Sequence, residues 1–282
     1  MTYRRLSILE IVYSNNDGIL DVCVEDELKH KISTLSREFI CVSVVVGVYF
    51  SDIIRFLSFI KFLRNLNIPV SISCYSEKML DCLEELKGLV GQIRIFVNIE
   101  KDATSIIEPL YKSLKAPQTN IVFLFELSHV SEFKMYERLL ETQDYIYNIS
   151  YNSSIGLEQY WNLAEYVSAL KMKYPMKIFQ EFTCAGVKFN NLKGICPART
   201  SLMCIGVDGN ISYCYKDTQN HGINIKDGEL ERLFEKLDTL IPKCKNVKCS
   251  EADFTYCMCG CPLDIEDSNN LYCIHNKGGV ML

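Results

Sequence analysis

The sequence has no excess of positive charge and no long apolar run. Its 30 lysine and arginine residues stand against 35 aspartate and glutamate residues among 282, which gives a formal net charge of −5. Nucleic acid is therefore not expected as a main partner, since a nucleic-acid surface needs a basic patch. The most apolar stretch, residues 39–50, is too short to span a membrane, and the N-terminus has no signal-peptide core. These absences predict a cytoplasmic protein.

Two further kinds of motif are missing. There is no glycine-rich phosphate loop, and the 4 histidines stand in no HxxE or HxxxH arrangement. Acidic residues do follow the first predicted strand, at Asp17, Glu25, Asp26 and Glu27. A solvated loop and a helix N-terminus, where carboxylates are favoured, explain them without an active site.

Short β-rich runs alternate with helical stretches through residue 183. Strands are expected at 6–14, 39–47, 68–76, 92–100, 120–128, 144–152 and 176–184, and helices at 25–36, 51–67, 77–89, 105–116, 131–143 and 156–173. Near-continuous apolar strands separated by helices predict a parallel sheet with helices packed outside. This many β/α units favour one curled sheet, a partial (β/α)6-type or full barrel, with a flat doubly wound sheet as the alternative.

The 14 cysteines are unevenly distributed. Four of them, Cys23, Cys41, Cys74 and Cys82, are scattered among apolar neighbours and are expected to behave as small core residues. The other ten lie among polar residues and glycines, where core packing is a poor explanation: Cys184, Cys196, Cys204, Cys214, Cys244, Cys249, Cys257, Cys259, Cys261 and Cys273. The contrast predicts a domain boundary near residue 184, with one domain at 1–183 and a second at 184–282.

The second predicted domain has little hydrophobic periodicity. Its pattern predicts a hairpin at 201–216, whose Asp-Gly turn lies between two short strands, and a helix at 227–241. Such a segment cannot bury enough apolar surface by itself, so its cysteines must hold it together.

Three chemistries compete for these thiols. Disulfides require an oxidising compartment. Structural zinc takes four ligands, usually as two close pairs, whereas iron–sulfur clusters take four thiolates each from loops and distant segments. Eight or more thiols in a loop-rich domain favour two iron–sulfur clusters, with zinc as the alternative.

The spacing of these cysteines resembles a known family. Cys196 is followed after twelve residues by Gly209 and after four more by Cys214. A second group then gives Cys244, Cys249, Cys257 and Cys261, and a last cysteine follows at Cys273. Residues 196–273 thus resemble the SPASM auxiliary-cluster domain of radical SAM peptide and protein maturases, with the first two intervals of the second group each two residues longer.

The resemblance implies two 4Fe-4S clusters and their ligands. One cluster would take Cys196, Cys204, Cys214 and Cys261, and the other would take Cys244, Cys249, Cys257 and Cys273. Cys184 and Cys259 are left without a role.

The order of strands and helices in the first domain resembles the radical SAM barrel, but that family's catalytic motif is missing. In the family, the loop after the first strand carries CxxxCxxC, whose thiolates hold the cluster that cleaves S-adenosylmethionine. Here that region offers Cys23 alone, and the motif occurs nowhere in the chain. Residues 44–52, in place of the family's Gly-Gly-Glu-Pro-like turn, contain one glycine. The resemblance therefore implies a degenerate barrel that binds no S-adenosylmethionine.

The expected function follows from this combination of motifs. An auxiliary cysteine set without the catalytic triad suggests a non-catalytic accessory protein of ribosomal peptide maturation. It would bind a precursor peptide or a partner radical SAM maturase. The alternatives are a cluster- or thiol-dependent redox enzyme acting on a peptide, and a zinc-stabilised binding module.

Overall fold

A computed structural model describes most of the first 240 residues. The described ranges are 6–35, 40–47, 49–75, 82–97, 119–134, 136–142, 146–151, 155–180, 201–217 and 219–240. The predicted helix at 105–116 lies outside them.

One mixed but mainly parallel sheet of nine strands organises the described chain. Its strands are β1 (Ile8–Ser14), β2 (Cys41–Val46), β3 (Val70–Cys74), β4 (Gln92–Phe96), β5 (Asn120–Leu127), β6 (Ile146–Tyr151), β7 (Ile178–Gln180), β8 (Leu202–Ile205) and β9 (Ile211–Ser212). Strands β1 to β7 lie side by side in chain order and are parallel, while β8 pairs parallel with the free side of β1 and β9 pairs antiparallel with β8. The predicted parallel sheet is confirmed.

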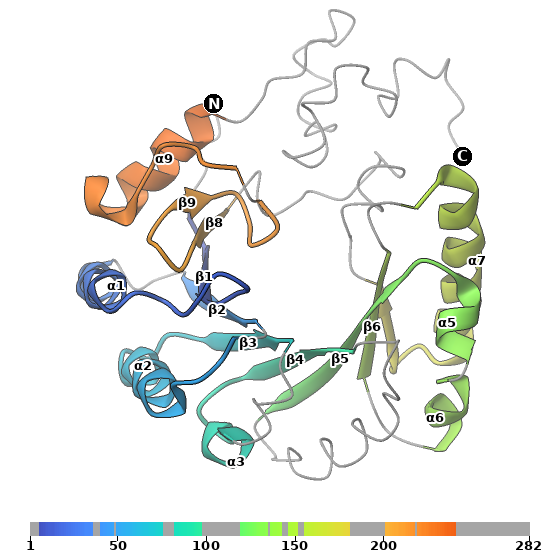
Figure 1. Ribbon diagram of the computed structural model, residues 1–282. Helices are drawn as coiled ribbons and strands as arrows, with labels where there is room; N and C mark the ends of the chain where they lie inside the picture. Colours follow the sequence, from blue (N-terminus) through green and yellow to red (C-terminus); the bar gives the residue numbers. More distant parts are fainter. Residues whose placement is uncertain are drawn as a thin grey trace, which may run out of the picture.

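The described helices lie on one side of this curved sheet (Figure 1). They are α1 (Val22–Thr34), α2 (Ile53–Asn65), α3 (Leu83–Leu86), α5 (Val130–Lys134), α6 (Glu137–Thr142), α7 (Leu157–Lys173), the 3-10 turn η3 (Ile225–Asp227) and α9 (Leu230–Leu240). The predicted helix at 131–143 is divided into α5 and α6. Every other predicted helix within the described chain is confirmed, although α3 is described over a shorter range than expected.

Two aspartates start the first two helices. Asp52 caps α2 by accepting a hydrogen bond from the Arg55 backbone N–H at 3.0 Å. Helix α1 begins earlier than predicted because Asp21 caps it, accepting from the Cys23 and Val24 N–H groups. Cys23 is exposed, so its expected place in the core is wrong, whereas Cys74 and Cys82 are buried as predicted.

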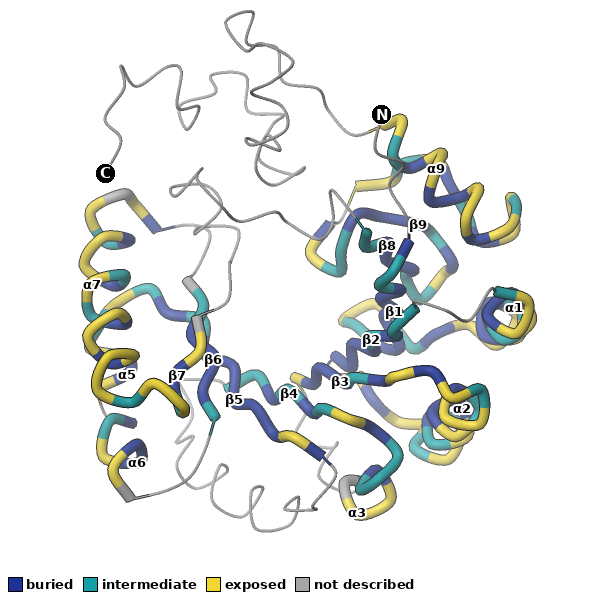
Figure 2. Tube along the Cα trace, turned by 180° about the vertical axis from the view of Figure 1, so that it is seen from behind, coloured by how far each residue is buried: buried dark blue, intermediate teal, exposed yellow. Residues whose placement is uncertain are grey.

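The sheet face toward the helices forms the hydrophobic core. In β1, Tyr13 is fully buried and its ring lies 4.9 Å from that of Phe56 in α2. The neighbouring row of register partners on this face is buried across β1 to β5: Ile11, Val44, Ile72, Ile93 and Ile121. Figure 2 shows the buried residues along the strands and the exposed ones on the outer sides of the helices.

The opposite, inner face of the sheet is polar, which the interpretation of near-continuous apolar strands did not anticipate. One row of register partners crosses six strands from β8 to β5: Cys204, Glu10, Ser43, Ser71, Gln92 and Asn120. Alternation along each strand sends these side chains away from the helix-covered face. A sheet face of this composition is suited to a polar ligand rather than to packing against another layer.

The described part of the predicted second domain continues this sheet. The predicted hairpin is present as β8 and β9, and β8 pairs with β1 from Ile8 to Ile11. Helix α9 packs beside it, with Leu230, Leu233, Phe234 and Leu237 buried. The boundary near residue 184 stays a prediction.

Glu25 differs from its interpretation as a solvated residue. Only 2% of it is exposed, and its carboxylate pairs with Arg55 at 2.7 Å and with Lys29 at 2.6 Å. Arg55 also donates to the Leu20 carbonyl, which ties α2 to the chain segment before α1. This carboxylate therefore has a structural role.

Within the described chain, no helix has the length and apolarity needed to cross a membrane.

Candidate functional site

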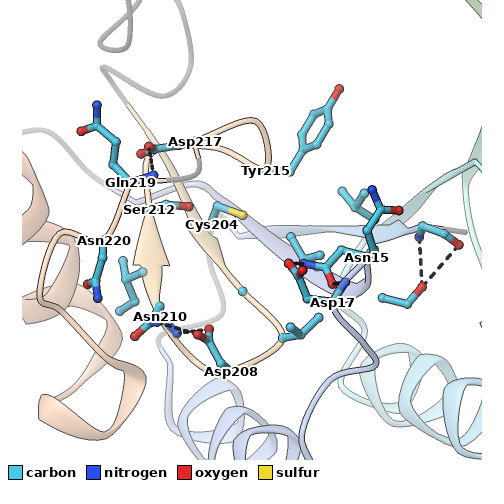
Figure 3. A pocket seen from close by; sticks show the side chains of 18 of the residues that line it. Asn15, Asp17, Cys204, Asp208, Asn210, Ser212, Tyr215, Asp217, Gln219 and Asn220 are labelled. Carbon is cyan, nitrogen blue, oxygen red and sulfur yellow. Dashed lines mark hydrogen bonds between the residues drawn. The ribbon is translucent and has the colours of Figure 1, made fainter. Parts of the chain in front are cut away.

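A cavity of about 770 Å³ opens at the carboxyl ends of β1, β2 and β3, beside the β8–β9 hairpin. Its floor includes Val12, Val45 and Ile211, and its walls are rich in side-chain carboxylates and amides. The polar lining residues are Ser14, Asn15, Asn16, Asp17, Tyr75, Cys204, Asp208, Asn210, Ser212, Tyr215, Asp217, Gln219 and Asn220 (Figure 3). Ligands of α/β proteins bind at this end of parallel strands, so the cavity is the candidate site.

The loop after β1 is a compact turn that contains no thiol. The Asn15 side-chain oxygen accepts from the Asp17 and Gly18 N–H groups at 2.8 and 3.1 Å. The chain returns at once, because the Leu20 N–H donates to the Tyr13 carbonyl at 2.8 Å. This tight loop lies where the resemblance expects a three-cysteine loop.

Gly47, at the end of β2, packs directly against that loop. Its N–H donates to the Ser14 carbonyl at 2.8 Å, and a Cβ at this position would lie 2.7 Å from the same oxygen and 2.8 Å from the Asn15 Cα. Only glycine permits this approach, so the single glycine of residues 44–52 serves loop packing.

The β8–β9 turn forms another wall of the cavity. The Gly206 N–H donates to the Asn210 carbonyl, and the Asp208 carboxylate accepts from the Asn210 backbone and side-chain nitrogens at 3.0 and 2.6 Å. Gly209 has φ +83°, and a Cβ there would lie 2.9 Å from the Ile225 side chain. The glycine on which the family resemblance relies is thus required by the turn and by its packing against η3.

Glu10 and Cys204 lie side by side beneath the cavity as register partners. Burial raises the pKa of the Glu10 carboxyl to about 7, although the Tyr215 N–H donates to it at 2.7 Å and opposes the shift. Burial, and then the nearby Glu10 and Cys214, raise the pKa of the Cys204 thiol well above its usual range. Below pH 7 both groups therefore favour their protonated forms.

The turn at residues 213–217 bridges the inner face of the sheet. It is closed by Asp217, which accepts from the Tyr213 N–H at 3.0 Å and pairs with His221 at 2.7 Å. Beyond its bond to Glu10 in β1, Tyr215 shares a 3.1 Å hydroxyl hydrogen bond with Tyr75, just after β3. Lys216 pairs with Glu126 in β5 at 3.5 Å.

An aromatic stack continues from that bridge along one side of the cavity. Tyr75 lies parallel to Phe96 of β4, with ring centroids 3.7 Å apart and an interplanar angle of 5°. Tyr215 is tilted against both rings, 6.4 Å from Tyr75 and 6.5 Å from Phe96. The two tyrosines thus present fixed ring surfaces to a bound molecule.

Only two of the eight predicted metal ligands fall within the described residues. Cys204 is buried in the cavity wall and Cys214 is half-buried close to it. Cys196, Cys244, Cys249, Cys257, Cys261 and Cys273 lie outside the described residues, as do Cys184 and Cys259. No group of three or more His, Cys, Asp or Glu side chains in the described ranges is arranged to hold a metal.

The two neighbouring thiols fit half of one thiolate-ligated site. Sulfur is the donor that iron–sulfur clusters and zinc both prefer, and two of the four thiols predicted for one cluster are brought together here. Glu10 beside Cys204 disfavours the thiolate that such a site needs, so ionisation would depend on the metal itself.

Sequence reasoning missed most of the cavity-lining side chains. It singled out Cys204 as a metal ligand and Asp17 as a solvated residue. It assigned no role to Glu10, Tyr75 or Tyr215. The sequence did contain a signal for a polar sheet face. Ser43, Ser71 and Arg94 each stand between two apolar residues in a predicted strand, and such alternation places polar side chains on the face opposite the apolar ones.

Comparison with known proteins supports the fold. The chain is similar to crystal structures of Streptococcus suis SuiB and shares their α/β fold. The complex of SuiB with precursor peptide SuiA matches at a TM-score of 0.60 and 14% identity, covering 87% of this chain and 69% of that one. SuiB bound to S-adenosylmethionine matches at a TM-score of 0.59 and 12% identity, covering 86% and 70%. At these identities the likeness shows the fold alone. No family model and no curated protein sequence matches this chain.

Proposed function

We propose that this protein is a non-catalytic accessory protein of a peptide-maturation system, which binds a precursor peptide or a partner radical SAM enzyme. The cavity beside the polar inner face of the sheet carries the proposal, because it supplies room and hydrogen-bonding groups for a peptide segment. The SuiB structure of the same fold holds its precursor peptide, which supports a peptide as the ligand here. In this proposal the curved sheet is a partial barrel.

The loop after β1 supports the non-catalytic role. A cluster that cleaves S-adenosylmethionine needs three thiolates there, and the turn from Asn15 to Gly18 has none. Gly47 packs so closely against this turn that a Cβ at position 47 would lie 2.7 Å from the Ser14 carbonyl oxygen.

The proposal includes two 4Fe-4S clusters in a SPASM-like C-terminal domain. Cys204 and Cys214 would be two ligands of the first, with Cys196 and Cys261, and the second would use Cys244, Cys249, Cys257 and Cys273. When bound, such clusters supply electron transfer or an open iron site. The chain's own part is to hold Cys204 within the cavity wall, where a ligated thiolate would border the bound peptide.

Metal analysis tests the cluster assignment. Protein reconstituted anaerobically with iron and sulfide is expected to bind about eight iron atoms per chain, and a Cys204→Ser, Cys214→Ser variant is expected to bind about four. Zinc alone, or no metal, would reject the clusters and leave a zinc-stabilised module or a metal-free protein.

A cleavage assay tests the non-catalytic role. The reconstituted protein is expected to produce no 5′-deoxyadenosine from S-adenosylmethionine under dithionite. Stoichiometric or catalytic cleavage by the purified chain would overturn that part of the proposal.

Peptide binding tests the partner. Labelled short peptides encoded beside the gene are expected to change fluorescence anisotropy on addition of the protein, and unlabelled peptide should compete. If neither these peptides nor a radical SAM enzyme encoded nearby binds, the accessory role is rejected.

A further inference from the structure

We propose that the cavity binds a positively charged side chain, an ammonium or guanidinium group carried on a peptide. This inference rests on the proposed peptide-binding function and adds the chemistry of the group that is recognised. It arises from the charge, the shape and the pairing of the residues that line the cavity.

The lining carries negative charge that no lining cation balances. Asp17, Asp208 and Asp217 are all present, whereas none of the lining residues is lysine, arginine or histidine. A phosphate or carboxylate would meet net repulsion in such a cavity, and a cation would be attracted.

Asp17 and Asp208 differ from the other carboxylates in their pairing. Ion pairs join Glu25 to Arg55 and Glu126 to Lys216, and Asp217 pairs with His221. Within the described chain, neither Asp17 nor Asp208 makes an ion pair. Their hydrogen bonds come from the neutral amides Asn15 and Asn210, and both aspartates are exposed to solvent, so no described cation neutralises either charge.

The two unpaired carboxylates come from separate elements that meet at the cavity. Asp17 lies in the loop after β1 and Asp208 in the β8–β9 turn, and both line the cavity below Tyr215 in the view of Figure 3. The Asp17 N–H donates to the Asn15 side-chain oxygen, and the Asn210 N–H donates to the Asp208 carboxylate, so the loop and the turn that carry the two aspartates are ordered before a ligand arrives.

The remaining lining suits the rest of a long cationic side chain. Val12, Val45 and Ile211 offer apolar surface to a methylene stem. Tyr75 is fixed by its stack on Phe96 and by its bond to Tyr215, so the two phenol rings can border a cation. The volume of about 770 Å³ accommodates such a side chain together with its flanking backbone.

Short model peptides test this inference without knowledge of the natural ligand. Calorimetry would compare acetyl-Ala-Lys-Ala-amide and its arginine counterpart with the peptides containing acetyl-lysine, norleucine or glutamate. At low salt, one or both cationic peptides are expected to bind about tenfold more tightly than each of the others. The stronger of the two identifies the group as ammonium or guanidinium.

Variants connect this preference to the cavity. Asp17→Asn and Asp208→Asn are each expected to weaken binding of the preferred cationic peptide about three- to fivefold, and high salt should do the same. Glu158→Gln, at an exposed carboxylate in the first turn of α7, is the matched control and should leave binding unchanged. Unchanged melting temperatures would show that the variants are folded.

The outcomes separate this inference from the proposed function. Equal binding of the norleucine or acetyl-lysine peptide, no binding of either cationic peptide, or no effect of Asp17→Asn and Asp208→Asn overturns the cation site. A precursor peptide that binds independently of both aspartates leaves the accessory role standing without this site. Preference for a cationic peptide without any precursor or partner binding leaves the site standing and rejects the accessory role.

Discussion

Single residues control how closely the segments around the cavity approach one another. Gly47 and Gly209 are the clearest cases, because each occupies a position where a Cβ would come within 3 Å of another group. Glu10 acts through electrostatics instead, because its carboxyl is buried and burial disfavours the charged form.

Replacing Gly47 with alanine is expected to destabilise the protein by about 1–3 kcal/mol, because the new methyl group would overlap the Ser14 carbonyl. Chemical denaturation measures the change. Gly91→Ala is the control, since its Cβ would meet nothing closer than the Val70 carbonyl at 3.9 Å. Equal stability of the two variants would show that the loop after β1 is not held as described.

Glu10 is expected to make stability depend on pH. Its carboxyl keeps a proton in the folded protein up to about pH 7, whereas the usual value is 4.5. The contribution of this protonation to the free energy of unfolding is fully present below pH 4.5. It is lost as the pH rises through about 7, which lowers the free energy of unfolding by up to about 3 kcal/mol.

Urea unfolding of metal-free protein between pH 4 and 8 measures this dependence. Glu10→Gln removes the titrating group, so the variant should lack this decrease and should exceed the wild type in stability at pH 8. Glu158→Gln should follow the wild type. A decrease of the same size in Glu10→Gln would assign it to other groups.

At the scale of elements, α1 and α2 are joined through a buried carboxylate. Glu25 of α1 lies between Arg55 of α2 and Lys29 of its own helix. Because Glu25 is almost fully buried, removing one of these partners would leave a buried carboxylate incompletely paired.

Arg55→Ala is expected to destabilise the protein by about 2–3 kcal/mol, since Glu25 would keep only Lys29 as a partner. Arg64→Ala, at an exposed position on the same helix, should change stability by less than about 0.5 kcal/mol. Thermal or chemical unfolding compares the two. If adding Glu25→Gln restored the stability lost in the Arg55→Ala variant, the loss would be assigned to the unpaired charge of Glu25. If stability did not recover, the loss would be assigned to lost packing and to the missing hydrogen bond with the Leu20 carbonyl.

The elements themselves were largely predictable. Strands such as residues 120–128 and helices such as 156–173 have enough periodicity and length to be identified locally. The division of 131–143 into α5 and α6 and the early start of α1 were missed, because each depends on a local hydrogen bond or turn rather than on hydrophobic periodicity.

At the scale of the whole molecule, the β8–β9 hairpin extends the sheet formed by β1 to β7. Strand β8 covers the side of β1 that β2 does not, and the turn at 213–217 contacts β1 directly and β5 through Lys216. The described residues on both sides of position 184 therefore share one core.

A chain truncated after residue 183 is expected to lose cooperative unfolding, because β1 would keep an unpaired edge and the inner face would lose the 213–217 turn. A chain ending at residue 240 retains the hairpin and α9 and should unfold cooperatively. Circular dichroism during thermal unfolding compares them. Cooperative unfolding of the shorter chain at the same temperature would establish residues 1–183 as an independent domain.

The sequence by itself determined the class of fold, a parallel sheet with helices packed outside, and the absence of a three-cysteine loop, because hydrophobic periodicity and motif spacing are local properties of the chain. Only the tertiary structure decided that β8 joins β1, that Glu10 and Cys204 become neighbours, and that Asp17 and Asp208 border one cavity. These contacts join residues about 190 positions apart or more, so no local pattern encodes them, and they arise when strand pairing brings distant segments into register.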